Sequence, residues 1–515
     1  MKKGIIMNGG QLYSTLKSKK IATMAGYASI VITTALNLIL TSLYLRTLGK
    51  DGYGLYQMIY SIAQYILILD MGISTVMVRY LVEYNSKGDN EGAENFAFHI
   101  GILILAILVI IAIGCMILNA SIEIIYVNLT AEEYAISHQM FLVMAMTIAL
   151  TIVQHYLRGI INSNELFVVG NVATIFASTL KFVIVYILLY RGVGIIAIAW
   201  SDFIVKLFVV LVGAYICFGQ LKFRIRPHKI NFKILSEAFV LMGGMLLHSV
   251  STFANNAIDK TILGILMSKS DVAIYAIAMP FITVYSMLPT IFTNMILPTA
   301  VRLKNSGAGG KEYTDLIVKV GRYQFAICGL MFVGFLACGK DFIVLMYGKD
   351  VVQAWVIAVI IMIPSLIQLS EEAINGVIDA NDKRLFFSSM VLIMSLLNIL
   401  LTIIMVRSWG ILGAPIATSI SYIAYFIIAR NIFAKRMFKL EIGRMIRDIP
   451  ARTIMCLFLA AVSGALLNCL FKEKYNIGIF LVKALAVFNV FVISMFWYGF
   501  DESEKKYLLG FIRRK

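Results

Sequence analysis

The sequence predicts an all-α polytopic membrane protein with 14 transmembrane helices, built from two six-helix lobes in parallel repeat plus two C-terminal helices. Three observations lead to this prediction: the composition, the distribution of basic residues, and an internal repeat. Of the 515 residues, 60% are hydrophobic and 14% are charged, and the mean hydropathy is +0.87. Soluble domains carry about 25% charged residues. The composition therefore excludes a string of soluble domains, and its apolar content excludes a disordered chain.

The spans follow from the apolar runs. A helix needs about 20 apolar residues to cross a hydrocarbon core of about 30 Å, and the chain meets this requirement fourteen times. The connectors between the runs are too short to form domains of their own. The predicted spans are 21–46, 54–82, 95–119, 135–160, 166–190, 193–218, 235–262, 272–300, 316–338, 351–379, 385–407, 410–434, 450–471 and 475–500.

The basic residues predict the direction of the spans. With the N-terminus inside, the cytoplasmic connectors and the helix ends beside them hold 32 of the 45 Lys and Arg residues, and the outer side holds nine. Cytoplasmic loops are enriched in Lys and Arg, so we expect both termini in the cytoplasm and the protein in a bacterial inner or plasma membrane. Topology then accounts for the net charge of +17, and nucleic acid is not an expected partner.

Three sequence anchors recur at nearly one spacing, which indicates a duplication of six spans. Since six is an even number, the two lobes are expected to be related by an axis along the membrane normal. The anchor pairs, offset by 219, 217 and 219 residues, are Lys50–Tyr56 with Lys269–Tyr275, Gly159–Asn164 with Gly376–Asn381, and Gly194–Ala199 with Gly413–Thr418. The predicted parts are a basic N-terminus (1–20), an N-lobe (21–218), a cytoplasmic linker (219–234), a C-lobe (235–436), spans 13 and 14 (437–500) and a basic tail (501–515).

Three motifs carry a resemblance to a known family. They are Leu45–Tyr56 after the first span, Asp70–Ser74 with Arg79 and Tyr80 in the second, and Ile258–Gly264 ahead of Ala273–Tyr275 in the second lobe. With the 6+6+2 layout, the chain resembles the polysaccharide transporter (O-antigen or teichuronic-type oligosaccharide flippase) branch of the multidrug/oligosaccharidyl-lipid/polysaccharide exporter superfamily. The resemblance implies translocation of an oligosaccharide linked to undecaprenyl diphosphate, from the inner to the outer leaflet, for surface polysaccharide biosynthesis. Lipid II flippases and drug/cation antiporters are relatives in that superfamily.

A cluster of charged residues is predicted in spans 5 and 6. An ionisable residue inside a span costs about 2.5–3.5 kcal/mol on insertion scales, so it must face protein or water. Lys181 and Asp202 are expected at similar depth across a helical hairpin, with Lys206 one turn from Asp202 on the same face. One interpretation is a structural cluster that compensates itself. The other is a phosphate site, because two cations and one anion leave a positive charge for a lipid diphosphate.

Span 7 carries a second polar group near its outer end, formed by Asn255, Asn256, Asp259 and Lys260. Lys260 could reach the membrane surface with Asp259 as its partner, as long basic side chains do. Alternatively, the four residues form an outer site that accepts the sugar or the diphosphate after translocation.

Asp70 lies deep in span 2 with no basic residue one helical turn away. It is expected to be protonated, hydrogen-bonded to a neighbouring helix, or a ligand of a coupling ion. Glu371 is a further candidate for carrying a coupling H⁺ or Na⁺. The alternative for Glu371 is a structural pairing with the basic connector around Lys383 and Arg384.

Glu371 and its neighbour Glu372 occupy the positions that correspond to Gln154 and His155 in the first repeat. Adjacent residues of a helix point to different faces, so only one glutamate is expected to face the cleft between the lobes.

Three further cations lie in or near the spans. Arg46, at the outer end of span 1, and Arg79, at the inner end of span 2, are either interfacial anchors or part of a cationic cleft. Lys483 in span 14 is expected to reach the surface or a lipid head group. Span 8 carries three prolines spaced nine residues apart, Pro280, Pro289 and Pro298. Because proline kinks a helix, this span is predicted to be bent and to act as a gate.

The sequence contains no nucleotide-binding, zinc-protease or serine-hydrolase motif. We therefore expect a transporter rather than an enzyme, with no cofactor beyond a coupling ion, H⁺ or Na⁺. Its expected partners are the lipid-linked oligosaccharide, membrane lipids, and a glycan polymerase and glycosyltransferases. The alternatives are a drug/cation antiporter, a lipid II-type precursor flippase, and, from a different class, a membrane-embedded glycan polymerase.

Overall fold

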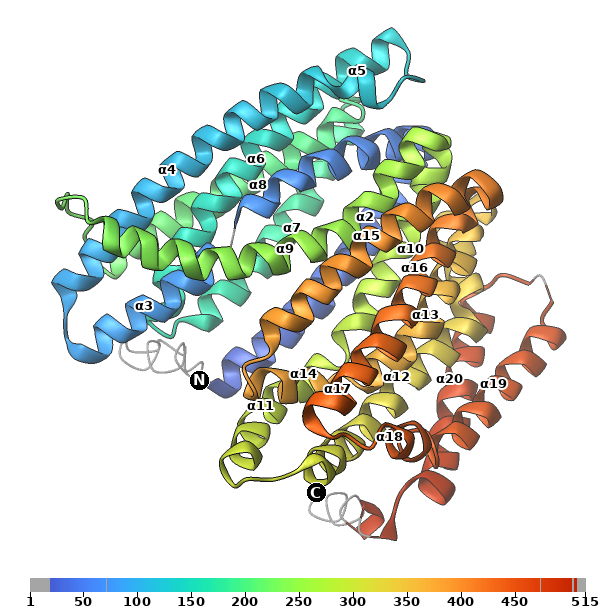
Figure 1. Cartoon of the computed structure of the whole chain (residues 1–515). Coiled ribbons are helices and arrows are strands. Elements are labelled where there is room, and N and C mark those ends of the chain that lie inside the picture. The colour runs from blue at the N-terminus through green and yellow to red at the C-terminus, as the bar shows by residue number, and fades with distance from the viewer. Residues whose placement is uncertain (1–18, 71, 473, 503, 507–515) are drawn as a thin grey trace, which may run out of the picture. The chain divides into compact units, whose positions relative to one another are not determined.

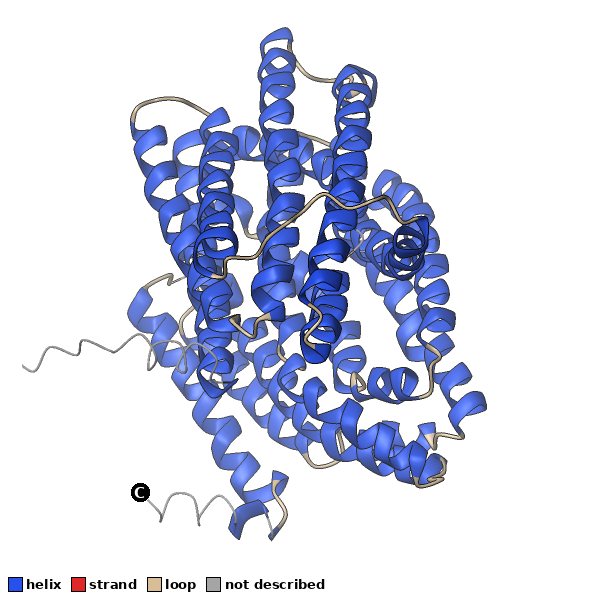
Figure 2. Cartoon of the chain, turned by 90° about the vertical axis from the view of Figure 1, so that its left-hand side faces the viewer, coloured by secondary structure: helices blue, strands red, loops and turns tan. Residues whose placement is uncertain are grey.

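The computed structural model describes residues 19–70, 72–472, 474–502 and 504–506, and every regular element within them is a helix (Figure 2). The predicted all-helical membrane fold is confirmed. Eleven stretches of the described residues are long and apolar enough to cross a membrane, and two of these, Met24–Lys87 and Arg384–Phe438, each cover two predicted spans. The predicted span 235–262 falls on a helix, Phe232–Leu266, that is not among the eleven.

The chain divides into two compact units, Met1–Ala273 and Ile274–Lys515. The helices of the first unit are α2 (Lys19–Ile66), η1 (Leu67–Asp70), α3 (Ile73–Lys87), α4 (Asn90–Ala120), α5 (Ile122–Ile125), α6 (Ala131–Ser163), α7 (Phe167–Tyr190), α8 (Ile196–Ala214), η2 (Tyr215–Gln220), α9 (Phe232–Leu266) and the start of α10 (Lys269–Met287). Within α2, Gly49 has φ 72° and ψ 178°. Glycine adopts positive φ without a Cβ clash, so Gly49 separates the first two predicted spans.

Polar residues at the loops define where these helices begin. The Asp89 carboxylate accepts a hydrogen bond from the Gly92 N–H at 2.7 Å at the start of α4. Thr130 and Glu133 form a reciprocal capping box at the start of α6. Such caps satisfy the free N–H groups of a first helical turn, so short loops are sufficient to reverse the chain.

Helix α6 is the central element of the first unit and packs against α2, α3, α4 and α8 (Figure 1). Its contact with α3 is close, because a Cβ on Gly159 would lie only 2.4 Å from the Cβ of Met77. This central position brings polar side chains of α6 next to those of α7 and α8.

Helix α9 packs against α2, α3, α4 and η1. Its first turn is also held by α4, because the Asn231 backbone N–H donates to Nε2 of the buried His99 at 2.7 Å. By packing, α9 therefore belongs to the first unit, whereas the repeat assigns its sequence to the lobe 235–436. The lobe boundaries remain a prediction about the duplicated sequence.

The second unit contains the rest of α10 and a helical bundle centred on α12. Its elements are α11 (Thr290–Asn305), α12 (Gly310–Tyr347), η3 (Lys349–Val351), α13 (Gln353–Ser370), α14 (Ala373–Ala380), α15 (Arg384–Trp409), η4 (Gly410–Leu412), α16 (Gly413–Tyr422), η5 (Ile423–Ala429), α17 (Arg430–Phe438), α18 (Ile442–Asp448), α19 (Thr453–Leu470), α20 (Ile477–Ser494) and η6 (Met495–Gly499). Helices α19 and α20, the predicted spans 13 and 14, both pack against α12.

The predicted span 8 is two helices, α10 and α11. Pro289 is the N-cap of α11, while Pro280 and Pro298 lie inside α10 and α11. The interruption lies at Leu288 and Pro289, and proline lacks the N–H that a continuous helix would use there. The role of these prolines as a gate remains a prediction.

The expectation for Lys483 was wrong. Its side chain is buried, and its Nζ lies 2.6 Å from Oδ2 of Asp341 on α12. A lysine surrounded by protein needs a counter-charge, and Asp341 is 142 residues away in sequence. Sequence spacing alone gave no reason to pair them.

Candidate functional site

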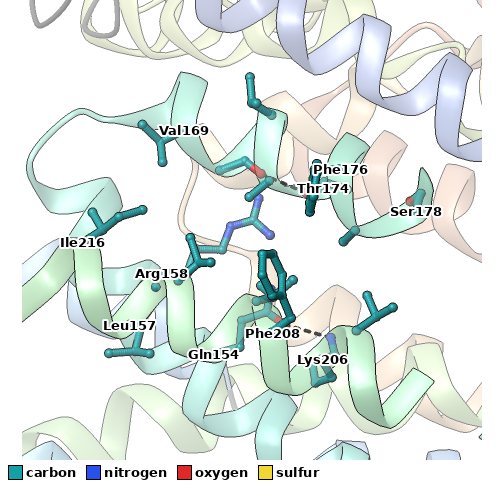
Figure 3. A pocket seen from close by; sticks show the side chains of 18 of the residues that line it. Gln154, Leu157, Arg158, Val169, Thr174, Phe176, Ser178, Lys206, Phe208 and Ile216 are labelled. Carbon is teal, nitrogen blue, oxygen red and sulfur yellow. Dashed lines mark hydrogen bonds between the residues drawn. The ribbon is translucent and has the colours of Figure 1, made fainter. Parts of the chain in front are cut away.

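A pocket of about 580 Å³ lies in the first unit between α6, α7 and α8 (Figure 3). Its volume falls within the range of about 300–1,000 Å³ that is usual for ligand sites. The pocket brings together Lys181, Asp202 and Lys206, which the sequence had placed in one cluster, and it adds Arg158 and Gln154 from α6.

Lys181 and Asp202 form an ion pair across the α7–α8 hairpin. The Lys181 Nζ lies 2.6 Å from Oδ1 of Asp202, and the two side chains are 24% and 28% exposed. The hydroxyl of Tyr56 on α2 donates to the other carboxylate oxygen of Asp202 at 3.4 Å. The carboxylate therefore compensates the charge of Lys181 and fixes its position.

Lys206 has a neutral partner. Its Nζ donates a hydrogen bond to Oε1 of Gln154 at 2.8 Å, as Figure 3 shows. An amide oxygen satisfies one of the three ammonium donors but cancels no charge. Lys206 therefore keeps both its positive charge and free donors at the pocket wall.

Arg158 extends from α6 between α7 and α8 (Figure 3). Among the residues that the structure describes, no acidic side chain forms an ion pair with Arg158 or Lys206. The four ionisable residues of the pocket are three cations and one anion, so its formal charge is +2. A guanidinium with free donors in a fork geometry is suited to bind phosphate oxygens.

The rest of the pocket wall is largely apolar. Phe176 of α7 and Phe208 of α8 approach each other with their ring centroids 5.5 Å apart. These two side chains are 52% and 40% exposed. The pocket lining thus combines three cations with aliphatic and aromatic side chains.

The predicted second repeat carries a different side chain at the position equivalent to Gln154. Glu371, the counterpart of Gln154, is buried, and its carboxylate accepts hydrogen bonds from Arg430 at 2.7 Å and Asn431 at 3.0 Å. The partner of Glu371 is therefore Arg430 rather than Lys383 or Arg384. Arg384 instead contacts Asp379 at 2.5 Å. Glu371 thus has a charged partner in Arg430, whereas Gln154 leaves the charge of Lys206 uncompensated.

The polar residues of α9 lie outside this pocket. The Lys260 Nζ donates to Oε1 of Gln57 on α2 at 3.2 Å, and Asp259 is buried. The side chains of Asn255 and Asn256 fall outside the described part of the structure. The proposed outer site on this helix remains a prediction.

The remaining candidates are also separate from the pocket. Asp70 is joined by a 2.7 Å hydrogen bond to Nδ1 of His155 on α6, which is one of the three states expected for it. Arg46 on α2 and Arg79 on α3 are exposed. Within the described ranges, no group of three His, Cys, Asp or Glu side chains is arranged to hold a metal ion.

Sequence reasoning missed Arg158, Gln154 and Tyr56 as parts of this site. Arg158 lies five residues before the end of α6 and had been counted with the cytoplasmic side in the topology. The sequence did contain a signal for this pair: Gln154 and Arg158 are four residues apart and therefore share one face of a helix. Their meeting with α7 and α8 depends on tertiary packing.

Comparisons with known proteins identify the family of this chain. Residues 23–304 match the family described as "Polysaccharide biosynthesis protein". The chain belongs to this family. A relative, the "Probable flippase AglR" of Haloferax volcanii, is 25% identical over 256 residues, which cover 47% of this chain and 50% of that protein. The chain thus matches about half the length of this curated relative.

Solved structures show the same fold. A structure described as "Lipid II flippase MurJ, inward closed conformation" has a TM-score of 0.67 at 16% identity, covering 92% of this chain and 98% of that one. An inward-facing multidrug resistance MATE family transporter of the MOP superfamily has a TM-score of 0.63 at 16% identity, covering 81% and 96%. The predicted resemblance to this superfamily is confirmed at the level of the fold.

Proposed function

We propose that this protein is a flippase that translocates a polyprenyl-diphosphate-linked oligosaccharide from the cytoplasmic to the outer leaflet for surface polysaccharide biosynthesis. The observation that carries the proposal is the pocket charge of +2, retained inside a multi-pass bundle by Arg158 and Lys206. Charged residues within membrane-spanning helices are costly to insert and usually mark a functional site. A diphosphate diester carries roughly two negative charges and requires such donors when it leaves water. Membership of the polysaccharide biosynthesis family supports the same class of substrate.

In the proposed mechanism, both termini are cytoplasmic and the head group binds from that side of a bacterial cell membrane. The two lobes then alternate between inward and outward access, while the polyprenyl chain stays in the bilayer. The protein acts as a transporter and carries no catalytic chemistry. The energy source is an H⁺ or Na⁺ gradient or the consumption of the glycan by a polymerase on the outer side, and glycosyltransferases supply the substrate.

Depletion of the protein in its own host tests the proposal. We expect surface polysaccharide to fall and the lipid-linked oligosaccharide to accumulate where an externally added, membrane-impermeant glycosidase does not reach it. Re-expression of the wild-type chain should restore both. Normal surface polysaccharide after full depletion, with increased sensitivity to cationic drugs, would instead identify a drug/cation antiporter.

A further inference from the structure

We propose that the pocket between α6, α7 and α8 binds the junction of the carrier lipid, where the diphosphate meets the first isoprene units, and admits it sideways between α7 and α8. This proposal rests on the proposed function and specifies which part of the substrate this pocket recognises. It assigns Arg158 and Lys206 as the ligands of the diphosphate, and Phe176 and Phe208 as the contacts of the isoprenoid chain.

The cations of the pocket suit a diphosphate by their charge and by the type of donor they offer. Arg158 and Lys206 approach from different helices, α6 and α8, and both keep donors for an external anion. The Arg158 guanidinium can hold one phosphate with two parallel hydrogen bonds, while the Lys206 ammonium acts as a point charge on the other. Lys181 contributes less because Asp202 already occupies it at 2.6 Å.

The apolar side chains of the pocket suit a hydrocarbon chain. Phe176 and Phe208 flank the α7–α8 side of the pocket with their faces partly exposed, and neighbouring Val172 and Leu211 are 53% and 60% exposed. In a membrane-spanning hairpin, exposed apolar residues of this kind contact lipid chains. A ligand that enters between the two helices can therefore leave its chain in the bilayer while its charged end reaches Arg158.

The combination of cations and apolar side chains disfavours ligands that have only an anionic group or only a hydrocarbon chain. Inorganic pyrophosphate would have the charge but no group for the apolar wall, and an isoprenoid alcohol would leave the two cations without an anion. A phospholipid presents a single phosphate of one negative charge with two acyl chains. The charge of +2 and the single aromatic pair favour a diphosphate that carries one chain.

Binding to the purified full-length protein tests the proposal, with farnesyl diphosphate as the probe and inorganic pyrophosphate, farnesol and phosphatidylglycerol as comparisons. We expect farnesyl diphosphate to bind at least tenfold more tightly than each comparison, a difference of about 1.4 kcal/mol. Arg158→Gln should weaken farnesyl diphosphate about tenfold or more. The control is Arg191→Gln, an exposed arginine at the turn between α7 and α8 that does not line the pocket, and it should leave the affinity unchanged.

A second pair of variants tests the chain contact. Phe176→Ala with Phe208→Ala should weaken farnesyl diphosphate but leave the affinity for inorganic pyrophosphate unchanged. Both side chains are partly exposed, so the melting temperature in detergent should stay near that of the wild type, which excludes misfolding as the cause.

Any of three results would overturn the proposal. The Arg158→Gln variant could bind farnesyl diphosphate as tightly as the wild-type protein does. The wild-type protein could bind pyrophosphate as tightly as farnesyl diphosphate, or phosphatidylglycerol more tightly than farnesyl diphosphate. Each leaves the proposed function standing if depletion still traps the lipid-linked oligosaccharide inside. The opposite combination is also informative. If purified protein binds farnesyl diphosphate tightly through Arg158, but depletion leaves the surface glycan of the host unchanged, the proposed function is contradicted while the lipid-diphosphate site is retained.

Discussion

The charge balance of the pocket predicts that a double substitution reduces ligand affinity and transport less than one of its single substitutions. Lys181→Gln lowers the formal charge from +2 to +1 and leaves the Asp202 carboxylate without its ammonium partner. The double variant Lys181→Gln, Asp202→Asn removes both charges and keeps the pocket at +2. If Arg158 and Lys206 are the anion ligands, the double variant should bind and transport better than the single variant.

The expected size follows from the burial of the pair. Exposed ion pairs contribute up to about 1 kcal/mol, and removal of one partner of a fully buried pair costs about 3–5 kcal/mol. The side chains of Lys181 and Asp202 are about one quarter exposed, so we expect Lys181→Gln to destabilise the first unit by about 2–3 kcal/mol. The unpaired Asp202 carboxylate beside the ligand repels the negative diphosphate, and we expect this repulsion to weaken binding about 10- to 100-fold.

Two measurements on each variant check this prediction: the melting temperature in detergent and the affinity for farnesyl diphosphate. The single variant should fall in both, and the double variant should recover most of both. If the double variant is as weak as the single variant in affinity while fully recovering its melting temperature, Lys181 itself contacts the ligand and the assignment to Arg158 and Lys206 is wrong.

Three structural predictions follow from other contacts. Lys483→Met should destabilise the second unit by about 3–5 kcal/mol because it leaves Asp341 buried without a partner, and adding Asp341→Asn should restore much of the lost melting temperature. Glu371→Gln should lower the folded yield in fluorescence-detected gel filtration, since the buried Arg430 loses its counter-charge; unchanged yield would show that Arg430 needs none. Gly159→Val should lower the melting temperature by forcing α3 from α6, whereas Gly114→Val, which meets open space, should not.

The sequence predicted most of the fold because its strongest signals are local. Apolar runs of the required length locate helices, and the break at Gly49 falls between the first two predicted spans. The interruption of span 8 likewise occurs at one of its prolines. These outcomes depend on backbone chemistry within a few residues, which a single sequence contains.

The candidate site was only partly predictable. Lys181, Asp202 and Lys206 could be grouped because a short hairpin sets the relative depth of its two helices. The contribution of α6 could not be predicted, because Gln154 and Lys206 are 52 residues apart in sequence and meet only through the packing of α6 against α8. The same limitation explains the error for Lys483, whose partner Asp341 is supplied by a distant helix.

Reconstitution into liposomes measures translocation of the lipid-linked oligosaccharide itself. An undecaprenyl-diphosphate-linked oligosaccharide with a fluorescent sugar would be placed in both leaflets, and a membrane-impermeant glycosidase added outside. With wild-type protein we expect digestion of nearly all the substrate. With the double variant Arg158→Gln, Lys206→Gln we expect digestion of only the outer half over the same time. Digestion limited to the outer half with wild-type protein, under an imposed H⁺ or Na⁺ gradient of either sign, would contradict the proposed function.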